Sequence, residues 1–243
     1  MSDKITAMTV GGKALAKVKR QLKEFVKPGT TYEEIEAFAQ QAIATCGMKP
    51  SFSTVPDYHW ATCIMKNAAL CHGIPKNGQV VAGDVVSIDV GLINQGYHLD
   101  TSITFGLEPL DAKKRWFLTI GQETLNKAIA IVKPGISVYQ ISRVIEKNLN
   151  KHGCGAVYQL TGHGVGKELH EEPAIPCVAD PLDKQIKLSA DQTIAIEVMY
   201  TLGQPDLVLD KNGWTYTTLD GSLSGMFEET VLVTRSGFKI LTD

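Results

Sequence analysis

The chain has 243 residues and a formal net charge of −2. A charge this close to zero provides no global field for nucleic acid or for an anionic membrane surface, so we expect neither as a partner. The N-terminus has no apolar signal segment, and no later stretch has the length and continuity of a transmembrane helix. These features predict a soluble protein of the cytoplasm.

Five cysteines occur without any Cys-x-x-Cys spacing, which indicates neither a disulfide framework nor a thiolate zinc site. The length is sufficient for a sizeable buried core. No extended apolar helix face indicates an obligate dimer, and we therefore expect a monomer.

Four helices are predicted from apolar residues at helical spacing. The first runs from Gly11 to Val26 and ends at Pro28-Gly29, and the second runs from Thr31 to about Cys46. In the second half, helices are predicted from Leu110 to Val132 and from Val138 to His152. Runs of β-branched residues elsewhere predict strands, so the chain has an α/β pattern.

The segment Val-Lys-Pro-Gly occurs at residues 26–29 and again at 132–135, and each copy joins two predicted helices. Chance likeness of helix punctuation is one explanation, and internal duplication is the one we favour. We predict a single catalytic domain over residues 1–243, with internal halves of about 10–110 and 111–240. A site at the interface of two such halves would draw residues from both.

Two aspartates interrupt segments that otherwise have the composition of buried strands. Asp89 lies in a β-branched run bounded by Gly83 and Gly91, and Asp100 lies in a second strand-like segment after the turn at 94–96. An ionised carboxylate is costly to bury unless a cation, proton or metal meets it. If the two segments form a hairpin, the carboxylates lie side by side, where a bound cation would relieve their repulsion.

Three further polar residues, His163, Glu197 and Glu228, occupy apolar or glycine-rich segments later in the chain. Together with the two aspartates they form an oxygen-rich set with one imidazole. Such a set suits Mn²⁺, Co²⁺, Fe²⁺ or Zn²⁺ better than a thiolate set would, and shared carboxylates suit two ions a few ångströms apart. The sequence therefore predicts a site for two divalent metal ions.

The order and spacing of several short motifs resemble those of type I methionine aminopeptidases over about residues 10–240. The motifs are Leu70-Cys71-His72-Gly73-Ile74-Pro75, Ile88-Asp89-Val90, Asp100-Thr101-Ser102, Gly162-His163-Gly164-Val165-Gly166, His170-Glu171-Glu172-Pro173, Ile196-Glu197 and Glu228-Glu229-Thr230. Each motif is weakly specific alone, whereas the ordered set is specific. The resemblance implies the pita-bread fold, an α/β (α+β) architecture of two pseudo-twofold-related halves with a curved antiparallel sheet and outer helices.

The resemblance also implies which residues are the metal ligands. Asp100 and Glu228 would bridge two divalent ions. Asp89 would complete the ligands of one ion, and His163 with Glu197 those of the other. In strands, alternate side chains face opposite ways, so Glu229 is not expected to bind metal.

The family removes the initiator methionine from peptides and nascent chains, and a transient association with the ribosome is expected. The resemblance implies that a metal-bridging hydroxide attacks the first peptide carbonyl, with Glu197 as general base. His170 would hydrogen-bond the scissile amide or its tetrahedral intermediate, and His72 would contact the P1′ side of the substrate. Without their motifs, His72 and His170 would be read as ordinary structural histidines. His98 and His152 lie in no such motif, and we expect them to be structural or solvent-facing.

Tyr58, Cys63 and Trp214 map onto the walls of the family's methionine pocket. Composition alone makes Cys63 and Trp214 core residues. An apolar slot that tolerates sulfur suits an unbranched thioether side chain, which makes favourable contacts with aromatic edges.

The sequence departs from the family pattern mainly in the pocket. Pro56 stands where the family usually has a pocket histidine, and His59 is displaced by three residues. Gly91 replaces the usual threonine, Leu99 the usual glycine and Val198 the usual proline. These departures leave two alternatives open, an aminopeptidase with an altered P1 preference and a catalytically weakened metal-binding homologue. A third alternative is a related aminopeptidase or Xaa-Pro peptidase. Those relatives usually carry a large extra N-terminal domain, whereas the helices here are expected to begin by about residue 11, which counts against this alternative.

Overall fold

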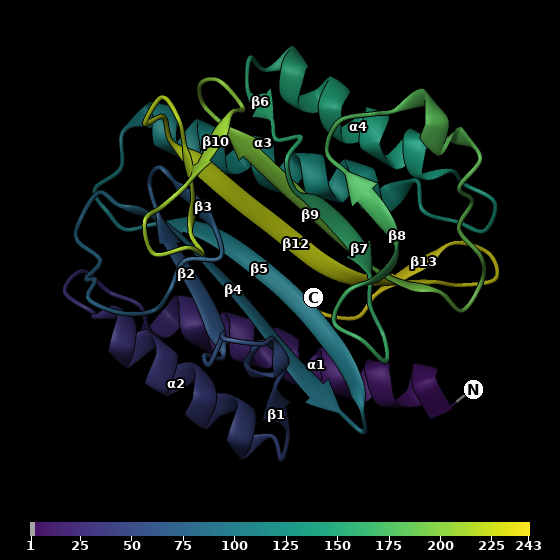
Figure 1. Ribbon diagram of the computed structural model, residues 1–243, viewed down its shortest axis with the longest axis horizontal. Helices are drawn as coiled ribbons and strands as arrows, with labels where there is room; N and C mark the ends of the chain where they lie inside the picture. Colours follow the sequence, from purple (N-terminus) through teal and green to yellow (C-terminus); the bar gives the residue numbers. More distant parts are fainter. Residues whose placement is uncertain (1–2) are drawn as a thin grey trace.

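The computed structural model describes residues 3–243, which form four α-helices and two β-sheets (Figure 1). The helices are α1 (Asp3–Phe25), α2 (Tyr32–Thr45), α3 (Ala112–Ala130) and α4 (Val138–Lys151), with short 3₁₀ turns η1 (Phe52–Thr54) and η2 (Pro181–Lys184). The strands of the larger sheet are β1 (Lys49–Pro50), β2 (Thr62–Lys66), β4 (Val85–Asn94), β5 (Tyr97–Gly106), β6 (Gly155–Ala156), β7 (Thr161–Gly164), β8 (Glu171–Pro176), β9 (Thr193–Thr201), β12 (Ser224–Val233) and β13 (Phe238–Ile240). Those of the smaller sheet are β3 (Ala69–Cys71), β10 (Leu207–Leu209) and β11 (Tyr216–Thr218).

The larger sheet is antiparallel and joins the two halves of the chain at its centre. Its strand order is β1-β4-β5-β12-β9-β7-β8, with β2 paired to β4, β6 to β9 and β13 to β12. Helix α1 packs on β4 and β5, and α3 packs on β9 and β12. None of the helices in residues 3–243 is long and apolar enough to cross a membrane.

Helix α1 begins at Asp3, so the prediction that it starts at Gly11 is wrong. The glycine pair lies inside the helix, where the helix closely approaches β5 and the C-terminal segment. A β-carbon on Gly11 would lie 2.5 Å from Cδ1 of Leu99, and one on Gly12 would lie 2.3 Å from the carbonyl oxygen of Leu241. Leu99, which replaces the family's usual glycine, therefore fills space that Gly11 leaves open.

The second helix of each pair, α2 in the first half and α4 in the second, begins in the same way. The predicted capping box of α2 is present, with the Thr31 hydroxyl accepting from the Glu34 amide, and α4 has its own capping box from Ser137 and Gln140. Each cap residue also forms an isolated bridge with a later segment, Thr31 with Gln79 and Ser137 with Lys187. This likeness supports internal duplication, which stays a prediction together with the domain boundaries.

The hairpin of β4 and β5 places the two aspartates on one face of the sheet. Its turn has two residues, Gln95 and Gly96, with φ of 51° and 76°, a pair of left-handed conformations that suits the strand twist. In the resulting register Asp89 lies opposite Ser102 and Asp100 lies opposite Gly91. Because opposite residues share a face, the two carboxylates are diagonal neighbours.

Candidate metal centre

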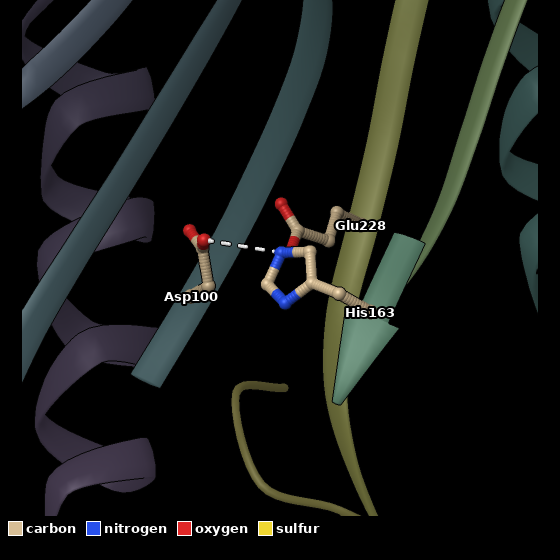
Figure 2. Close-up of side chains that lie close together, drawn as sticks. All are labelled: Asp100, His163 and Glu228. Carbon is tan, nitrogen blue, oxygen red and sulfur yellow. Dashed lines mark ion pairs between the residues drawn. The ribbon is translucent and has the colours of Figure 1, made fainter. Parts of the chain in front are cut away.

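Five strands, β4, β5, β7, β9 and β12, bring four carboxylates and one imidazole together on a single face of the larger sheet. Asp89 of β4 and Glu228 of β12 both lie opposite Ser102, and Glu228 lies opposite Glu197 of β9. Asp100 lies two residues from Ser102 on β5. His163 of β7 pairs with Ala195, which lies two residues from Glu197 on β9. Figure 2 shows Asp100, Glu228 and His163 pointing toward one another from β5, β12 and β7.

The distances are those of a compact donor set. One ligand atom from each of Asp100, His163 and Glu228 lies within 4.8 Å of the others. The Nε2 atom of His163 lies 3.3 Å from Oε1 of Glu197 and 3.9 Å from Oδ2 of Asp100. All five predicted ligands are buried, Glu228 with an exposed fraction of only 1%.

Several oxygens of this set are left without hydrogen-bond donors. Asp89 Oδ1, Asp100 Oδ1 and Glu228 Oε1 are buried and accept no hydrogen bond from any of residues 3–243. Buried carboxylates are stable only when a cation or proton meets them. These oxygens and the adjacent imidazole therefore fit divalent ions that accept both oxygen and nitrogen ligands.

The electrostatics of the cluster show what such an ion would compensate. Burial, and then the charges of neighbouring carboxylates, raises the pKa of Asp89 and of Glu228 well above the usual range. Burial also raises the pKa of Asp100 to about 7, although His163 opposes the shift. Burial lowers the pKa of His163, but Glu197 and Asp100 outweigh it and raise the value to about 9.

The ring of His163 is oriented for ligation. Its Nδ1 lies 2.8 Å from the carbonyl oxygen of Gly164, which only accepts, so Nδ1–H is the donor. In the neutral ring this leaves the lone pair of Nε2 directed at the carboxylates. The backbone of β7 therefore selects the tautomer that a metal requires.

The metal-free protein is expected to lose thermal stability as the pH rises from 6.5 to about 9. The pKa values of Asp89, Asp100 and Glu228 are higher in the folded than in the unfolded chain, so their ionisation at rising pH destabilises the fold. The raised pKa of His163 acts in the same direction, because its stabilising proton is lost toward pH 9. A tenfold difference in proton affinity is worth about 1.4 kcal/mol, and about 1 kcal/mol shifts the midpoint by about 2–4 °C.

Scanning calorimetry of the chelator-stripped protein at the two ends of this pH range checks the expectation. We expect a fall in midpoint of roughly 5 °C or more, which Mn²⁺ reduces and Glu228→Gln partly removes. His72 and His170, whose pKa values are lowered, act below this range. A metal-free midpoint that rises with pH would contradict the expectation.

A cavity of about 120 Å³ opens beside the donor set. All five predicted ligands line it, and so do the predicted substrate residues, His72, His170, Tyr58, Cys63 and Trp214. A larger open depression of about 770 Å³ beside α4 contains no carboxylate or histidine in its lining. The cavity next to the carboxylates is therefore the one that can combine binding with chemistry.

The predicted pocket walls contact one another. Tyr58 donates a hydrogen bond from its hydroxyl to the carbonyl of Thr62 at 2.8 Å, and the same hydroxyl lies 3.1 Å from Sγ of Cys63. The rings of Tyr58 and Trp214 meet edge to face, with centroids 5.1 Å apart. Burial, and then the charge of Asp89, raises the pKa of Cys63 well above its usual value, so the wall presents a neutral thiol.

The two histidines occupy different parts of the cavity. His72 is half-buried and has a φ of 54°, a conformation that is uncommon for residues other than glycine and that often occurs at functional sites. His170 is exposed at the mouth, where its ring meets that of His163 edge to face with centroids 4.5 Å apart. Partial desolvation, and then the charge of His163, lowers the pKa of His170 to about 4.

Four further lining residues, Phe52, Val55, Cys71 and Leu169, were not predicted from the sequence. Gly91 is the sequence feature that could have indicated Phe52 as a lining residue, since a β-carbon at position 91 would lie 2.8 Å from Cε1 of the Phe52 ring. The family's usual threonine at this position is incompatible with Phe52 in its present place. Pro56 and His59 are both exposed and do not line the cavity.

The whole chain is similar to known metallopeptidases. The model of metallopeptidase family M24 matches residues 6–235. A methionine aminopeptidase of Buchnera aphidicola (subsp. Schizaphis graminum) is 35% identical over 99% of this chain and 92% of its own length. The crystal structure of methionine aminopeptidase from Thermotoga maritima matches with a TM-score of 0.97 and 34% identity, covering 100% of this chain and 98% of that one.

A prolidase from Pyrococcus furiosus shares the fold alone, with a TM-score of 0.79 and 23% identity, and this chain spans 64% of its length. The fold and the site thus define a metallopeptidase with the pita-bread architecture predicted from the sequence. The chain belongs to metallopeptidase family M24 and, within it, to the methionine aminopeptidases. The predictions of the fold class and of a hydrolase of this kind are confirmed, and membership in the family implies that the protein binds divalent metal.

Proposed function

We propose that this chain removes the N-terminal methionine from peptides and nascent chains with the help of two divalent ions, of Co, Mn, Fe or Zn. Asp100 and Glu228 would bridge the ions. Asp89 would serve one of them, and His163 with Glu197 the other. The observation that carries the proposal is the set of buried carboxylate oxygens that accept no hydrogen bond from residues 3–243 and that belong to residues lining the cavity of about 120 Å³.

Bound ions would supply Lewis acidity, which polarises a carbonyl oxygen and lowers the pKa of a water molecule. The chain's own residues supply the rest. Glu197 would accept the proton of the attacking water and return it to the leaving amine. His170, at the exposed mouth, would donate a hydrogen bond to the scissile group, and His72 would contact the P1′ side of the substrate.

The P1 side chain would enter between Tyr58, Cys63 and Trp214. Aromatic edges and a neutral thiol make favourable contacts with a thioether, and an unbranched side chain can adapt to a small cavity. Phe52 and Leu169 narrow the same space. A shift of P1 preference relative to other members of the family is the alternative that these residues favour.

The proposal is tested by hydrolysis of Met-Ala-Ser with protein stripped by a chelator and then titrated with Co²⁺ or Mn²⁺. Leu-Ala-Ser and Pro-Ala-Ser serve as matched substrates. Release of methionine that depends on restored metal is expected, with little release of leucine or proline.

Release of proline or leucine in preference to methionine would show an altered P1 preference. No release from any peptide by metal-loaded protein would favour the weakened metal-binding homologue. Cytoplasmic location, transient association with the ribosome and a monomeric state stay predictions.

A further inference from the structure

A buried ion pair lies directly behind the candidate metal centre, on the opposite face of the sheet. Lys19 of α1 and Glu229 of β12 have exposed fractions of only 7% and 9%, and the lysine ammonium contacts Oε1 of the glutamate. The same ammonium donates to the hydroxyl of Thr101 at 3.1 Å. Glu229 and Thr101 therefore each adjoin a predicted bridging ligand, Glu228 and Asp100.

A second contact of Glu229 extends this arrangement to the backbone of Asp100. Oε2 of Glu229 accepts from the hydroxyl of Thr242 at 2.5 Å, and that hydroxyl accepts from the amide of Thr230 at 2.9 Å. The Thr230 hydroxyl donates to the Asp100 carbonyl at 2.7 Å and accepts from the Asp100 amide at 3.1 Å. A continuous series of contacts thus runs from Lys19 to the main chain of Asp100.

These contacts occur where the central sheet has few ladder pairs. Strands β12 and β9 pair over nine positions, from Ser224 to Leu232, whereas β12 and β5 pair only at Glu228 and Glu229. On either side of these pairs, threonine hydroxyls join the strands, from Thr104 to the carbonyl of Met226 at 2.6 Å and from Thr230 to the carbonyl of Asp100 at 2.7 Å. The seam that carries both predicted bridging carboxylates therefore depends on side chains for its spacing.

A buried ion pair is weak evidence for stability, because apolar residues of similar volume often stabilise a fold as well or better. Its geometric value is different, since charged partners with several fixed hydrogen bonds hold two strands in one arrangement. We propose that Lys19, Glu229 and Thr242 act as positioning residues, which fix the separation of Asp100 and Glu228 and thereby raise the affinity for metal. The proposal rests on the proposed function only in taking these two residues as ligands.

The test measures Mn²⁺ binding by calorimetric titration of the full chain after chelator treatment. Thr242→Val removes only the bridging hydroxyl and is expected to weaken Mn²⁺ binding by about 10- to 100-fold, the usual effect of losing an outer contact to a ligand. Thr242→Ser, which restores the hydroxyl, should bind as the wild type does. The double variant Lys19→Met with Glu229→Met should bind Mn²⁺ as weakly as Thr242→Val while keeping a folded, cooperative thermal transition.

The outcomes separate this proposal from the metal centre itself. If Asp100→Ala loses Mn²⁺ but Thr242→Val and the double variant bind with wild-type affinity, the positioning role is refuted and the centre stands. If Asp100→Ala binds as tightly as the wild type, the centre itself is refuted. If the double variant fails to fold, Thr242→Val against Thr242→Ser still decides the matter.

Discussion

Replacement of Asp100 by alanine is expected to abolish both metal binding and hydrolysis. One of its oxygens lies within 4.8 Å of ligand atoms of His163 and Glu228, and its Oδ1 accepts no hydrogen bond from residues 3–243. If it bridges two ions, its loss removes a ligand from each. Lewis-acid stabilisation worth about 4 kcal/mol or more corresponds to a loss of hydrolysis of about 10³-fold or more.

Metal content per chain and turnover of Met-Ala-Ser measure this effect. The wild type should retain two ions, and Asp100→Ala and Glu228→Ala should retain none. Glu108→Ala is a suitable acidic control, because that carboxylate is exposed and contacts Arg115 and the amide of Leu110 on the surface. Substantial turnover by either ligand variant would refute the bridging roles.

The candidate ligands of this site are predictable because they break a local rule. A carboxylate within a β-branched run is anomalous on its own, and the alternation of strand side chains then places Asp89, Asp100 and Glu228 on a common face once the strands pair. The register that brings Asp89 beside Asp100 follows from the two-residue turn between β4 and β5, so nearby residues alone determine it. The pairing of β12 with both β5 and β9 brought the second half of the chain to the same face.

Contacts between distant segments were not predictable in this way. Lys19 and Glu229 are separated by 210 positions, and a lysine in a helix with this pattern is usually solvated. The lysine is buried where α1 packs against β5, a close approach that Gly11 permits. The predicted helix start at Gly11 is wrong for the same reason, because glycine inside a helix is unfavourable unless close packing requires it.

The pocket shows an intermediate case. The resemblance to a family predicts Tyr58, Cys63 and Trp214 as pocket walls, and all three line the cavity, whereas Phe52 and Leu169 line it at positions that carry no motif. Gly91 departs from the family pattern, but what this departure allows depends on the position of η1 beside β4. The sequence around Gly91 shows that a side chain is absent there, but only the tertiary structure shows that Phe52 occupies the space.

Replacement of His170 by alanine is expected to lower kcat by about 10²-fold or more while leaving the metal content unchanged. The ring lies at the mouth of the cavity, in edge-to-face contact with His163, and is exposed, unlike the five predicted ligands. A donor in this place reaches the substrate rather than the ions. An interaction made mainly in the transition state lowers kcat and kcat/KM together, and leaves KM nearly constant.

Steady-state kinetics with Met-Ala-Ser and metal analysis of the same samples measure both quantities. His170→Gln retains a hydrogen-bond donor and should recover part of the activity, which a role in packing alone would not explain. His59→Ala is the matched control, because His59 is exposed and does not line the cavity. Unchanged turnover in His170→Ala would make the residue structural, and a loss of metal would show that it supports the metal centre instead of acting on the substrate.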